Sequence, residues 1–480
     1  MYHSRLTSAL AMAALAAILV SSTLPAQITF QRTYGGPDCD EGYSVRQTAD
    51  GGYIITGRTG PLWSGDVYLI KTGALGETLW TRKYGGNDDD YGLSVGLTAD
   101  GGYIICGFTY SFGAGADDLY LIRTDAGGDT LWARAYGGSG PDAGFSVQQT
   151  ADGGFIASGF GDGDWEEAYL VKTNALGDTQ WTRMFPGMNW DGTSVQQTAD
   201  SGYIVAGTTG GDAYLLKYDA NGDTQWTRTY SGGRTSYGLS VRQTADGGYI
   251  VAGRMDSGTD YNDVYVIRTD GNGQALWTKT FGGTNHDEGL SVQQVADGGY
   301  IVVGYTRSYG AGGSDAYVLR LDGNGDTLWT KIIGGPNGDC ATSVQLTTDG
   351  GYVIAGYTGS FGAGGVDVWL IKTDSLGNVA VAEPKASPTR APALSLACTP
   401  NPATGTTTIH LTPFASRLSP FALRIYDAQG CRVRTFTVNR EPCTVWDGKD
   451  DFGQPLPSGA YFVRCDVAGE HATTRIVLQR

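Results

Sequence analysis

The sequence predicts an all-β protein in which seven four-stranded blades close into a ring, followed by a separate C-terminal module. Three observations lead to this prediction. The segment QTADGGYIVAG at 243–253 recurs in seven near-copies, and an aromatic residue recurs at intervals of 45 to 52 residues. Between these marks lie short strand-like runs joined by glycine-rich turns, without helical periodicity. The 75 glycines and 28 tyrosines among 480 residues also favour strands and turns.

The first 26 residues are typical of a secretory signal peptide. Arg5 precedes an apolar run from Ala9 to Val20, which is short for a membrane span, and small residues follow up to a cleavage point after Ala26. An uncleaved anchor is the alternative. No later segment is apolar enough to cross a bilayer, so we expect a secreted protein with no transmembrane segment after cleavage.

One repeat unit contains four strand-like runs. In the unit starting at residue 238 they are GLSVRQT, YIVAGRM, DVYVIRTD and QALWTKTF. The first pair is joined by ADGG and the last pair by GNG, which are tight-turn signals. Four strands joined in this way form an antiparallel meander, the blade of a β-propeller. A parallel β-helix is the alternative architecture, but its coils lack paired hairpin turns.

The fourth strand of each blade carries the recurring aromatic residue. The tryptophans are Trp80, Trp132, Trp181, Trp226, Trp277 and Trp329, and Phe30 takes the same place 50 residues before Trp80. The chain therefore begins on a fourth strand and ends its repeats, near Asp374, on a third. We expect residues 28–34 to complete the seventh blade, so that a propeller spanning 27–378 has no exposed sheet edge.

Seven cysteines behind a secretory signal permit disulfides. Cys39 and Cys340 occupy similar loop positions in the first and last units, so ring closure would allow a disulfide clasp between them. Free or differently paired thiols are the alternative. Four more cysteines leave three connectivities open, among them Cys431 with Cys443 and Cys398 with Cys465.

The phrase TDGNGQALW resembles the tryptophan-docking repeat of quinoprotein-type, PQQ-dehydrogenase-like propellers. Gly273 to Trp277 and Gly325 to Trp329 keep the spacing of that repeat, whereas its aspartate lies one residue closer to the glycine here. The resemblance covers about 350 residues and implies a propeller architecture. It places no quinone-binding or calcium-ligand residue in this chain, and an oxidoreductase is therefore only an alternative.

A proline- and alanine-rich linker at 379–395 leads to the C-terminal module at 396–480. This module resembles the domain shared by hook-capping-type (FlgD-like) proteins and type IX (Por) secretion sorting domains. The resemblance is carried by PNP at 400–402, IYD at 425–427, WDG at 446–448 and SGAY at 458–461. It implies an Ig-like β-sandwich, export by a type IX-like secretion machinery, and attachment to or release from the cell surface.

The residue inventory excludes several functional classes. The net charge of −16, with no basic run, argues against nucleic acid and anionic membrane surfaces as partners. Four scattered histidines give no zinc spacing and no His-based triad. GLSVG at 92–96 matches a nucleophile elbow, but Ser94 is the repeat serine and precedes a hairpin. We therefore predict no enzyme. A polysaccharide-degrading enzyme is an alternative that would need a blade breaking the repeat, such as FPGMNWDG at 185–192.

Each repeat also places an acidic residue before its third strand and a basic residue five positions later. These pairs are Asp66/Lys71, Asp118/Arg123, Glu167/Lys172, Asp212/Lys217, Asp263/Arg268, Asp315/Arg320 and Asp367/Lys372. Seven copies indicate a structural role, either capping of loop amides or pairing between blades.

The longer, variable loops join second to third strands and fourth to first strands, so they share one face of the ring. Variable loops on a rigid frame commonly carry binding sites. The candidate residues on this face are Trp63, Asp88, Asp89, Asp90, Phe112, Trp165, Trp190, Asp287, Glu288 and Tyr309. Aromatic rings stack on sugars, and carboxylates bind sugar hydroxyls or calcium. We predict a glycan or an extracellular protein as ligand, without a cofactor or metal site, calcium being the one ion this face could hold. A merely solvated acidic rim and a purely structural surface protein are the alternatives.

Overall fold

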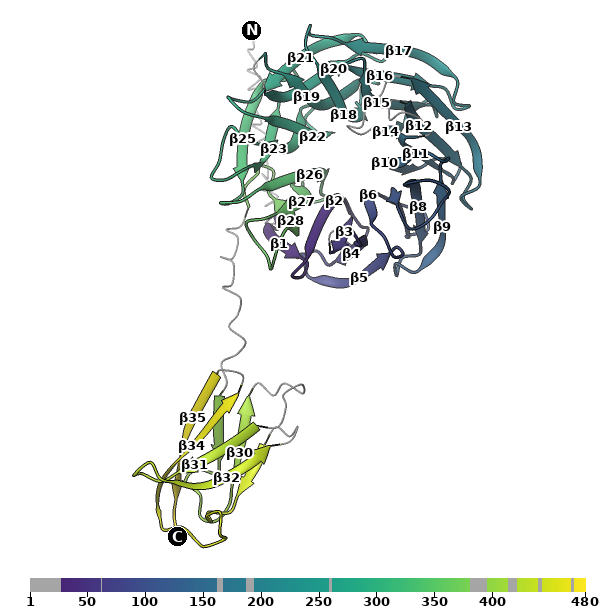
Figure 1. Cartoon of the computed structure of the whole chain (residues 1–480). Coiled ribbons are helices and arrows are strands. Elements are labelled where there is room, and N and C mark those ends of the chain that lie inside the picture. Colours follow the sequence, from purple (N-terminus) through teal and green to yellow (C-terminus); the bar gives the residue numbers. More distant parts are fainter. Residues whose placement is uncertain are drawn as a thin grey trace, which may run out of the picture. The chain divides into compact units, whose positions relative to one another are not determined.

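The computed structural model describes residues 27–61, 63–161, 167–186, 194–258, 261–379, 395–412, 421–438, 443–467 and 470–480. Every regular element in these ranges is a β-strand, and the chain divides into two compact units, Met1–Glu383 and Pro384–Arg480 (Figure 1). Among the described residues no helix is long and apolar enough to span a membrane. The predicted signal peptide at 1–26, Trp165 and Trp190 lie outside these ranges.

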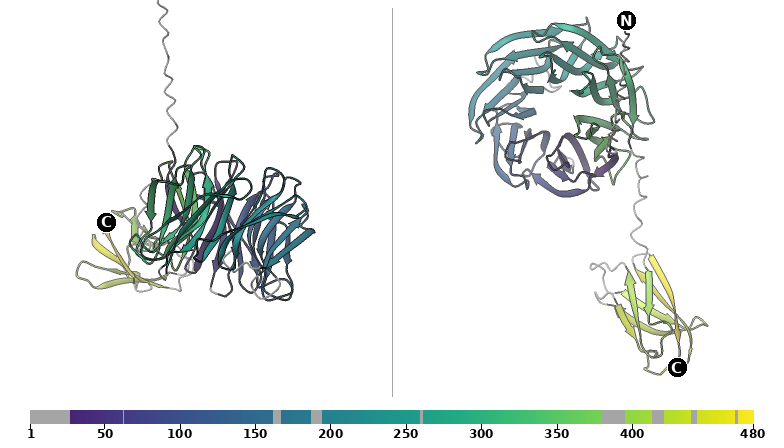
Figure 2. Two further views of the ribbon diagram at one scale, coloured as in Figure 1. Left: turned by 90° about the horizontal axis from the view of Figure 1, so that it is seen from above. Right: turned by 180° about the vertical axis from the view of Figure 1, so that it is seen from behind.

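The first unit consists of seven four-stranded antiparallel sheets arranged around a central axis (Figures 1 and 2). Its strands are β1 (Phe30–Tyr34), β2 (Cys39–Gln47), β3 (Tyr53–Gly60), β4 (Asp66–Thr72), β5 (Thr78–Tyr84), β6 (Asp90–Leu97), β7 (Tyr103–Thr109), β8 (Asp118–Thr124), β9 (Thr130–Tyr136), β10 (Ala143–Gln149), β11 (Phe155–Phe160), β12 (Glu167–Thr173), β13 (Thr179–Pro186), β14 (Ser194–Gln197), β15 (Tyr203–Thr209), β16 (Asp212–Tyr218), β17 (Thr224–Tyr230), β18 (Ser236–Gln243), β19 (Tyr249–Asp256), β20 (Asn262–Thr269), β21 (Ala275–Phe281), β22 (Asp287–Gln294), β23 (Tyr300–Thr306), β24 (Asp315–Leu321), β25 (Thr327–Ile333), β26 (Asp339–Leu346), β27 (Tyr352–Thr358) and β28 (Asp367–Thr373). The predicted all-β fold of repeated four-stranded sheets is confirmed.

The first strand of the chain completes the last sheet. β1 pairs antiparallel with β28 from Phe30 opposite Lys372 to Tyr34 opposite Val368, giving the sheet order β1-β28-β27-β26. The hydrogen bond from Asp40 N to Val366 O, 2.7 Å long, adds a backbone link between the first and last repeats. Within the predicted segment 28–34, Phe30–Tyr34 therefore lies where the repeat count placed it.

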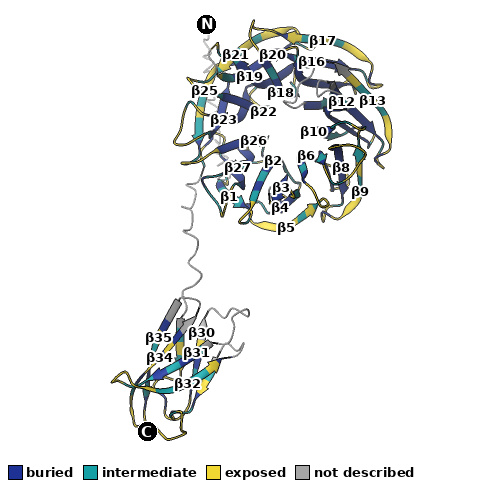
Figure 3. Ribbon diagram, in the orientation of Figure 1, coloured by how far each residue is buried: buried dark blue, intermediate teal, exposed yellow. Residues whose placement is uncertain are grey.

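The core lies between neighbouring sheets rather than within one sheet. The second and third strands of the sheets are mostly buried, whereas the fourth strands alternate between exposed and half-buried residues (Figure 3). One cluster joins Leu69 of the first full sheet to Val95 and Ile105 of the next. Such clusters recur around the ring, so each sheet buries its apolar residues against the adjacent sheets.

The repeat tryptophans dock each sheet on the next. Trp80 of β5 meets Tyr103 of β7 with ring centroids 6.1 Å apart, and Phe30 meets Tyr53 at the same 6.1 Å, so Phe30 takes the tryptophan position as predicted. Gly128 lies against the Trp80 ring at a φ of +80°, and a Cβ on it would come within 2.8 Å of that ring. The glycine of each NG-type turn thus serves both the turn and the docked ring.

Two further repeated contacts explain residues that the sequence left unassigned. The repeat serine accepts a hydrogen bond from a valine N–H of the next sheet, as from Val147 N to Ser94 Oγ at 3.3 Å, which confirms that Ser94 is structural. Each third-strand basic residue forms an ion pair with the aspartate of its own ADGG-type turn. These pairs are Lys71–Asp50, Arg123–Asp100, Lys172–Asp152, Lys217–Asp200, Arg268–Asp246, Arg320–Asp297 and Lys372–Asp349.

The second unit contains two antiparallel sheets over one core. A three-stranded sheet has the order β29 (Ser395–Thr399), β30 (Thr407–Thr412), β33 (Cys443–Trp446), and a four-stranded sheet has the order β32 (Arg432–Val438), β31 (Phe421–Tyr426), β34 (Gly459–Val467), β35 (Glu470–Leu478). Trp446 is fully buried and packs against Tyr461 with ring centroids 5.3 Å apart. The WDG and SGAY motifs therefore supply facing core residues.

The structure shows free thiols at Cys39, Cys340, Cys398 and Cys431, so it contains neither the predicted clasp nor the pairs suggested for the tail. The reason at the ring closure is register. Asp40 and Asp339 are equivalent, since each accepts a backbone N–H four residues earlier in the chain. Cys39 precedes its aspartate, whereas Cys340 follows its own. The two cysteines therefore do not occupy equivalent positions, although the sequence had suggested that they do.

Candidate functional site

The variable-loop face does not present all of its predicted carboxylates to solvent. Asp90 and Asp287 are fully buried, and each accepts hydrogen bonds from a glycine N–H and a serine hydroxyl, Gly86 and Ser111 for the first. The prediction that these two aspartates face a ligand is wrong. Each begins the first strand of its sheet and ties down the loops above it.

Glu288 and Asp89 are engaged in ion pairs with arginines. Glu288 Oε1 lies 2.7 Å from Arg254 Nη1, and only 7% of Glu288 is exposed. Asp89 Oδ1 accepts from Arg58 Nη2 at 2.6 Å, from Arg58 Nε at 3.2 Å and from Gly65 N at 2.8 Å. Both carboxylates therefore stabilise this face of the ring through ion pairs with arginines.

Phe112 and Tyr309 are half-exposed and occupy equivalent loop positions. Phe112 packs on Tyr120 with centroids 5.8 Å apart, and Tyr309 packs on Tyr317 at 6.1 Å. The Tyr309 hydroxyl also donates to Gly282 O at 2.6 Å. Both rings therefore pack on the third strand of their own sheets.

One pocket on this face combines an exposed tryptophan with carboxylates and further rings. Its volume is about 450 Å³, and it is lined by Trp63, Asp88, Asp89, Tyr91, Phe108 and Tyr110. Trp63 is 84% exposed at a φ of 72°, a left-handed conformation that bulky residues rarely adopt. Asp88 is exposed. Three of the predicted residues, Trp63, Asp88 and Asp89, thus line one pocket, and their role in binding stays a prediction.

The floor of this pocket is a rigid aromatic stack. Tyr91 and Phe108 are parallel, with centroids 4.5 Å apart and an interplanar angle of 18°, and Tyr110 meets Phe108 edge-on at 5.9 Å. The Arg58 guanidinium lies over the Tyr91 ring at 5.3 Å. Burial is the main cause that raises the pKa of Tyr91, so this phenol stays neutral at ordinary pH. Tyr91, Phe108 and Tyr110 were missed because Tyr91 and Phe108 belong to strand runs that looked purely structural.

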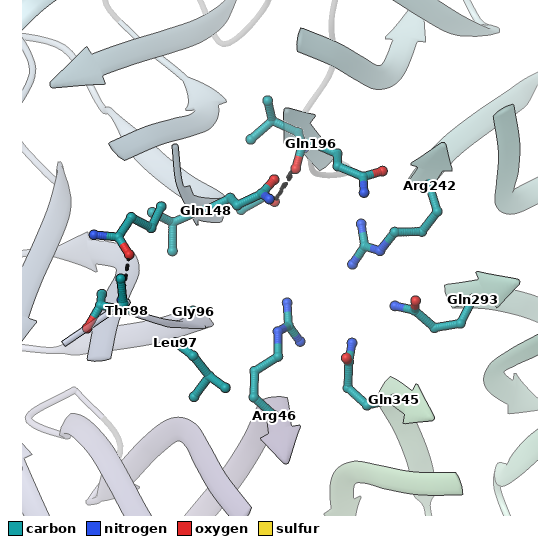
Figure 4. Close-up of a pocket in the computed structure, with 14 residues that line it drawn as sticks. Arg46, Gly96, Leu97, Thr98, Gln148, Gln196, Arg242, Gln293 and Gln345 are labelled. Carbon is teal, nitrogen blue, oxygen red and sulfur yellow. Dashed lines mark hydrogen bonds between the residues drawn. The ribbon is translucent and has the colours of Figure 1, made fainter. Parts of the chain in front are cut away.

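A second pocket lies on the axis at the opposite, tight-turn face of the ring. Its volume is about 590 Å³, and its lining includes one equivalent first-strand residue from every sheet (Figure 4). These residues are Arg46, Gly96, Gln148, Gln196, Arg242, Gln293 and Gln345. This pocket was not predicted, because that face was expected to carry only short turns. The available signal was that this register position varies within an otherwise copied segment.

Among the described residues no three His, Cys, Asp or Glu side chains are placed to hold a metal ion. The segment FPGMNWDG, proposed as the break in the repeat, lies largely outside the described residues. Within the described residues, the repeat is interrupted at the axis by Gly96, Arg46 and Arg242, which stand where the other four sheets have glutamine.

Comparison with known proteins identifies the C-terminal segment. Residues 398–479 match the secretion system C-terminal sorting domain. The predicted resemblance is therefore confirmed, and with it the location: such a domain marks proteins that the type IX system exports to the cell surface or beyond.

The chain has more distant likenesses. Over 161 residues the chain is 29% identical to the regulatory protein FlaEY of Caulobacter vibrioides, a match covering 28% of this chain and 17% of that protein. The surface component PorZ of the Porphyromonas gingivalis type IX secretion system is 12% identical, with a TM-score of 0.41 over 93% of this chain and 60% of PorZ. A puromycin hydrolase is 14% identical, with a TM-score of 0.47 over 78% and 59% of the two chains. TM-scores below 0.5 say nothing about activity.

Proposed function

We propose that this exported protein is a non-catalytic binding module, displayed at the cell surface, that holds a glycan in the Trp63 pocket. Its ring is a seven-bladed β-propeller, and its tail is an Ig-like module that engages the type IX secretion machinery. The alternatives are a polysaccharide-degrading or quinoprotein-like enzyme and a purely structural surface protein.

The observation that carries the proposal is the exposed Trp63 beside the aromatic stack and the free carboxylate of Asp88. A sugar ring offers an apolar C–H face, which stacks on indole, and hydroxyls, which donate to carboxylates. The stack of Tyr91 and Phe108 is preorganised, since both rings are fixed by strands and Asp89 is held by Arg58. Little ordering is therefore required when a ligand binds.

The test is a binding titration of the secreted chain against a panel of neutral and amino-bearing polysaccharide fragments. We expect Trp63→Ala and Asp88→Asn each to weaken binding of a bound glycan about five- to thirtyfold, since each contact contributes about 1–2 kcal/mol. Phe452→Ala is the matched control, because Phe452 is an exposed aromatic of the second unit, 89% accessible. Unchanged affinity in both pocket variants would exclude the Trp63 pocket. Hydrolysis of the fragments by the wild type would favour an enzyme instead.

A further inference from the structure

We propose that the axial pocket at the tight-turn face binds an oxyanion, the carboxylate, sulfate or phosphate group of a small acidic ligand, between Arg46 and Arg242. This site is separate from the Trp63 pocket and stands whether or not a glycan binds there.

The lining of this pocket offers hydrogen-bond donors and contains no acidic side chain. The pocket is lined by two arginines and several glutamines, and no Asp or Glu is among its lining residues. Figure 4 shows the side chains of Arg46 and Arg242 reaching into the middle of the pocket from two different sheets. In a chain with a net charge of −16, this accumulation of positive charge is local and specific.

Neither guanidinium has a carboxylate partner among the described residues. Arg46 Nη1 donates to Val45 O at 2.8 Å and Arg242 Nη1 donates to Val241 O at 2.7 Å, each the carbonyl of the preceding residue. The seven third-strand lysines and arginines, by contrast, all have an aspartate partner. Two unneutralised charges facing one pocket repel each other and are costly to desolvate, and a bound anion removes both penalties.

The electrostatic consequence is visible in both side chains. Burial, and then the charge of Arg242, lower the pKa of Arg46 to about 9, and burial lowers the pKa of Arg242 to about 10. Both residues remain protonated at neutral pH, so the pocket is cationic when empty.

Two of the four axial glutamines, Gln148 and Gln196, are oriented as donors. The carboxamide oxygen of Gln148 accepts from Gln197 N at 2.9 Å, and that of Gln196 accepts from Gln243 N at 2.7 Å. With each oxygen held by the next sheet, the NH₂ end is left to donate to a ligand. Planar guanidinium groups flanked by amide donors suit the geometry of a carboxylate, sulfate or phosphate.

Gly96 provides the room. Six of the seven sheets place a long side chain at this register, whereas the second full sheet places none. The resulting volume of about 590 Å³ lies in the range of small-molecule sites.

The experiment is a thermal melt and a calorimetric titration of the secreted chain in chloride buffer of constant ionic strength. Sodium phosphate, sulfate and glucuronate are the probes, with uncharged glucose as the neutral control. Arg46→Gln and Arg242→Gln are the variants, because glutamine already occupies the same register in four other sheets and is compatible with folding. Lys83→Gln, an exposed cation on β5, is the charge-matched control.

We expect at least one oxyanion to bind the wild type and the Lys83 variant with equal affinity, and each Arg→Gln variant at least tenfold more weakly. Without an oxyanion, the arginine variants should melt at the same or a higher temperature than the wild type, because the repulsion between Arg46 and Arg242 is gone. The oxyanion that binds identifies the acidic group. The proposal is overturned if no oxyanion binds beyond the chloride background, or if binding survives both substitutions.

Discussion

Replacing Asp89 by Asn should destabilise the ring strongly, because it leaves Arg58 buried without its counter-charge. The Arg58 side chain is 2% exposed and that of Asp89 8%. Two donors of Arg58 share one carboxylate oxygen, with Nη2 2.6 Å and Nε 3.2 Å from Asp89 Oδ1. Breaking a buried pair by removing one partner costs about 3–5 kcal/mol. We take the lower part of this range, since asparagine loses the charge but keeps an oxygen that can accept from Arg58 and from Gly65 N.

The assay is urea unfolding followed by tryptophan fluorescence, comparing free energies of unfolding. Asp129→Asn is the matched control, because Asp129 is 76% exposed in its pair with Arg82 and should contribute under about 1 kcal/mol. The double variant Arg58→Met with Asp89→Asn should recover much of the loss, since no charge stays buried. A loss in Asp89→Asn no greater than in Asp129→Asn would refute the reasoning.

Three other predictions follow from contacts described above. Gly128→Ala should lower the free energy of unfolding by about 1–3 kcal/mol, because alanine disfavours a φ of +80° and its Cβ would meet the Trp80 ring; a loss below that of Gly36→Ala, which has open space, would contradict this. Burial, and then neighbouring carboxylates, raise the pKa of Asp117 to about 6, and they also raise the pKa of Asp66, Asp263 and Asp315. The folded state therefore binds more protons than the unfolded state between about pH 4 and 6. These aspartates accordingly stabilise the folded state as pH falls through that window. Burial alone would raise the pKa of Asp50, but hydrogen bonds from Lys71 and Thr48 lower it to about 2. The contribution of Asp50 to the free energy of unfolding therefore disappears as pH falls from about 4 to 2. Urea unfolding should show a maximum in stability between pH 4 and 6, and a monotonic rise up to pH 8 would disprove this prediction. Chelation of calcium should leave the melting temperature unchanged, because among the described residues no three acidic, His or Cys side chains are placed to hold an ion; a calcium-dependent rise in a melt with and without EDTA would show an ion site.

The sequence predicted the repeat frame because each unit contains the residues that dock the next. Phe30 could be aligned with the tryptophans, and this alignment alone placed β1 beside β28. The face carrying the longer loops was also predictable, since hairpin turns of fixed sequence define the other face.

Individual side chains at the candidate sites were harder to predict. Asp88, Asp89 and Asp90 are consecutive, yet one is exposed, one pairs with a buried arginine and one is fully buried. Which of them points inward depends on where β6 begins, a detail of strand register that composition does not contain. The axial arginines were missed for a different reason: Arg46 and Arg242 are 196 residues apart, and only the ring brings them together.

Ring closure through β1 also makes the chain sensitive to where its amino-terminal end is cut. The last sheet has only three strands of its own, and residues 30–34, from the beginning of the repeats, pair with β28 to supply the fourth. A chain shortened past Tyr34 would expose the backbone N–H and C=O groups of β28, a template onto which a strand from another molecule can add. Loss of β1 would thus leave the ring with an open sheet edge to which a strand of a neighbouring chain can add. Residues 30–34 therefore protect the ring from strand addition as well as completing its last sheet.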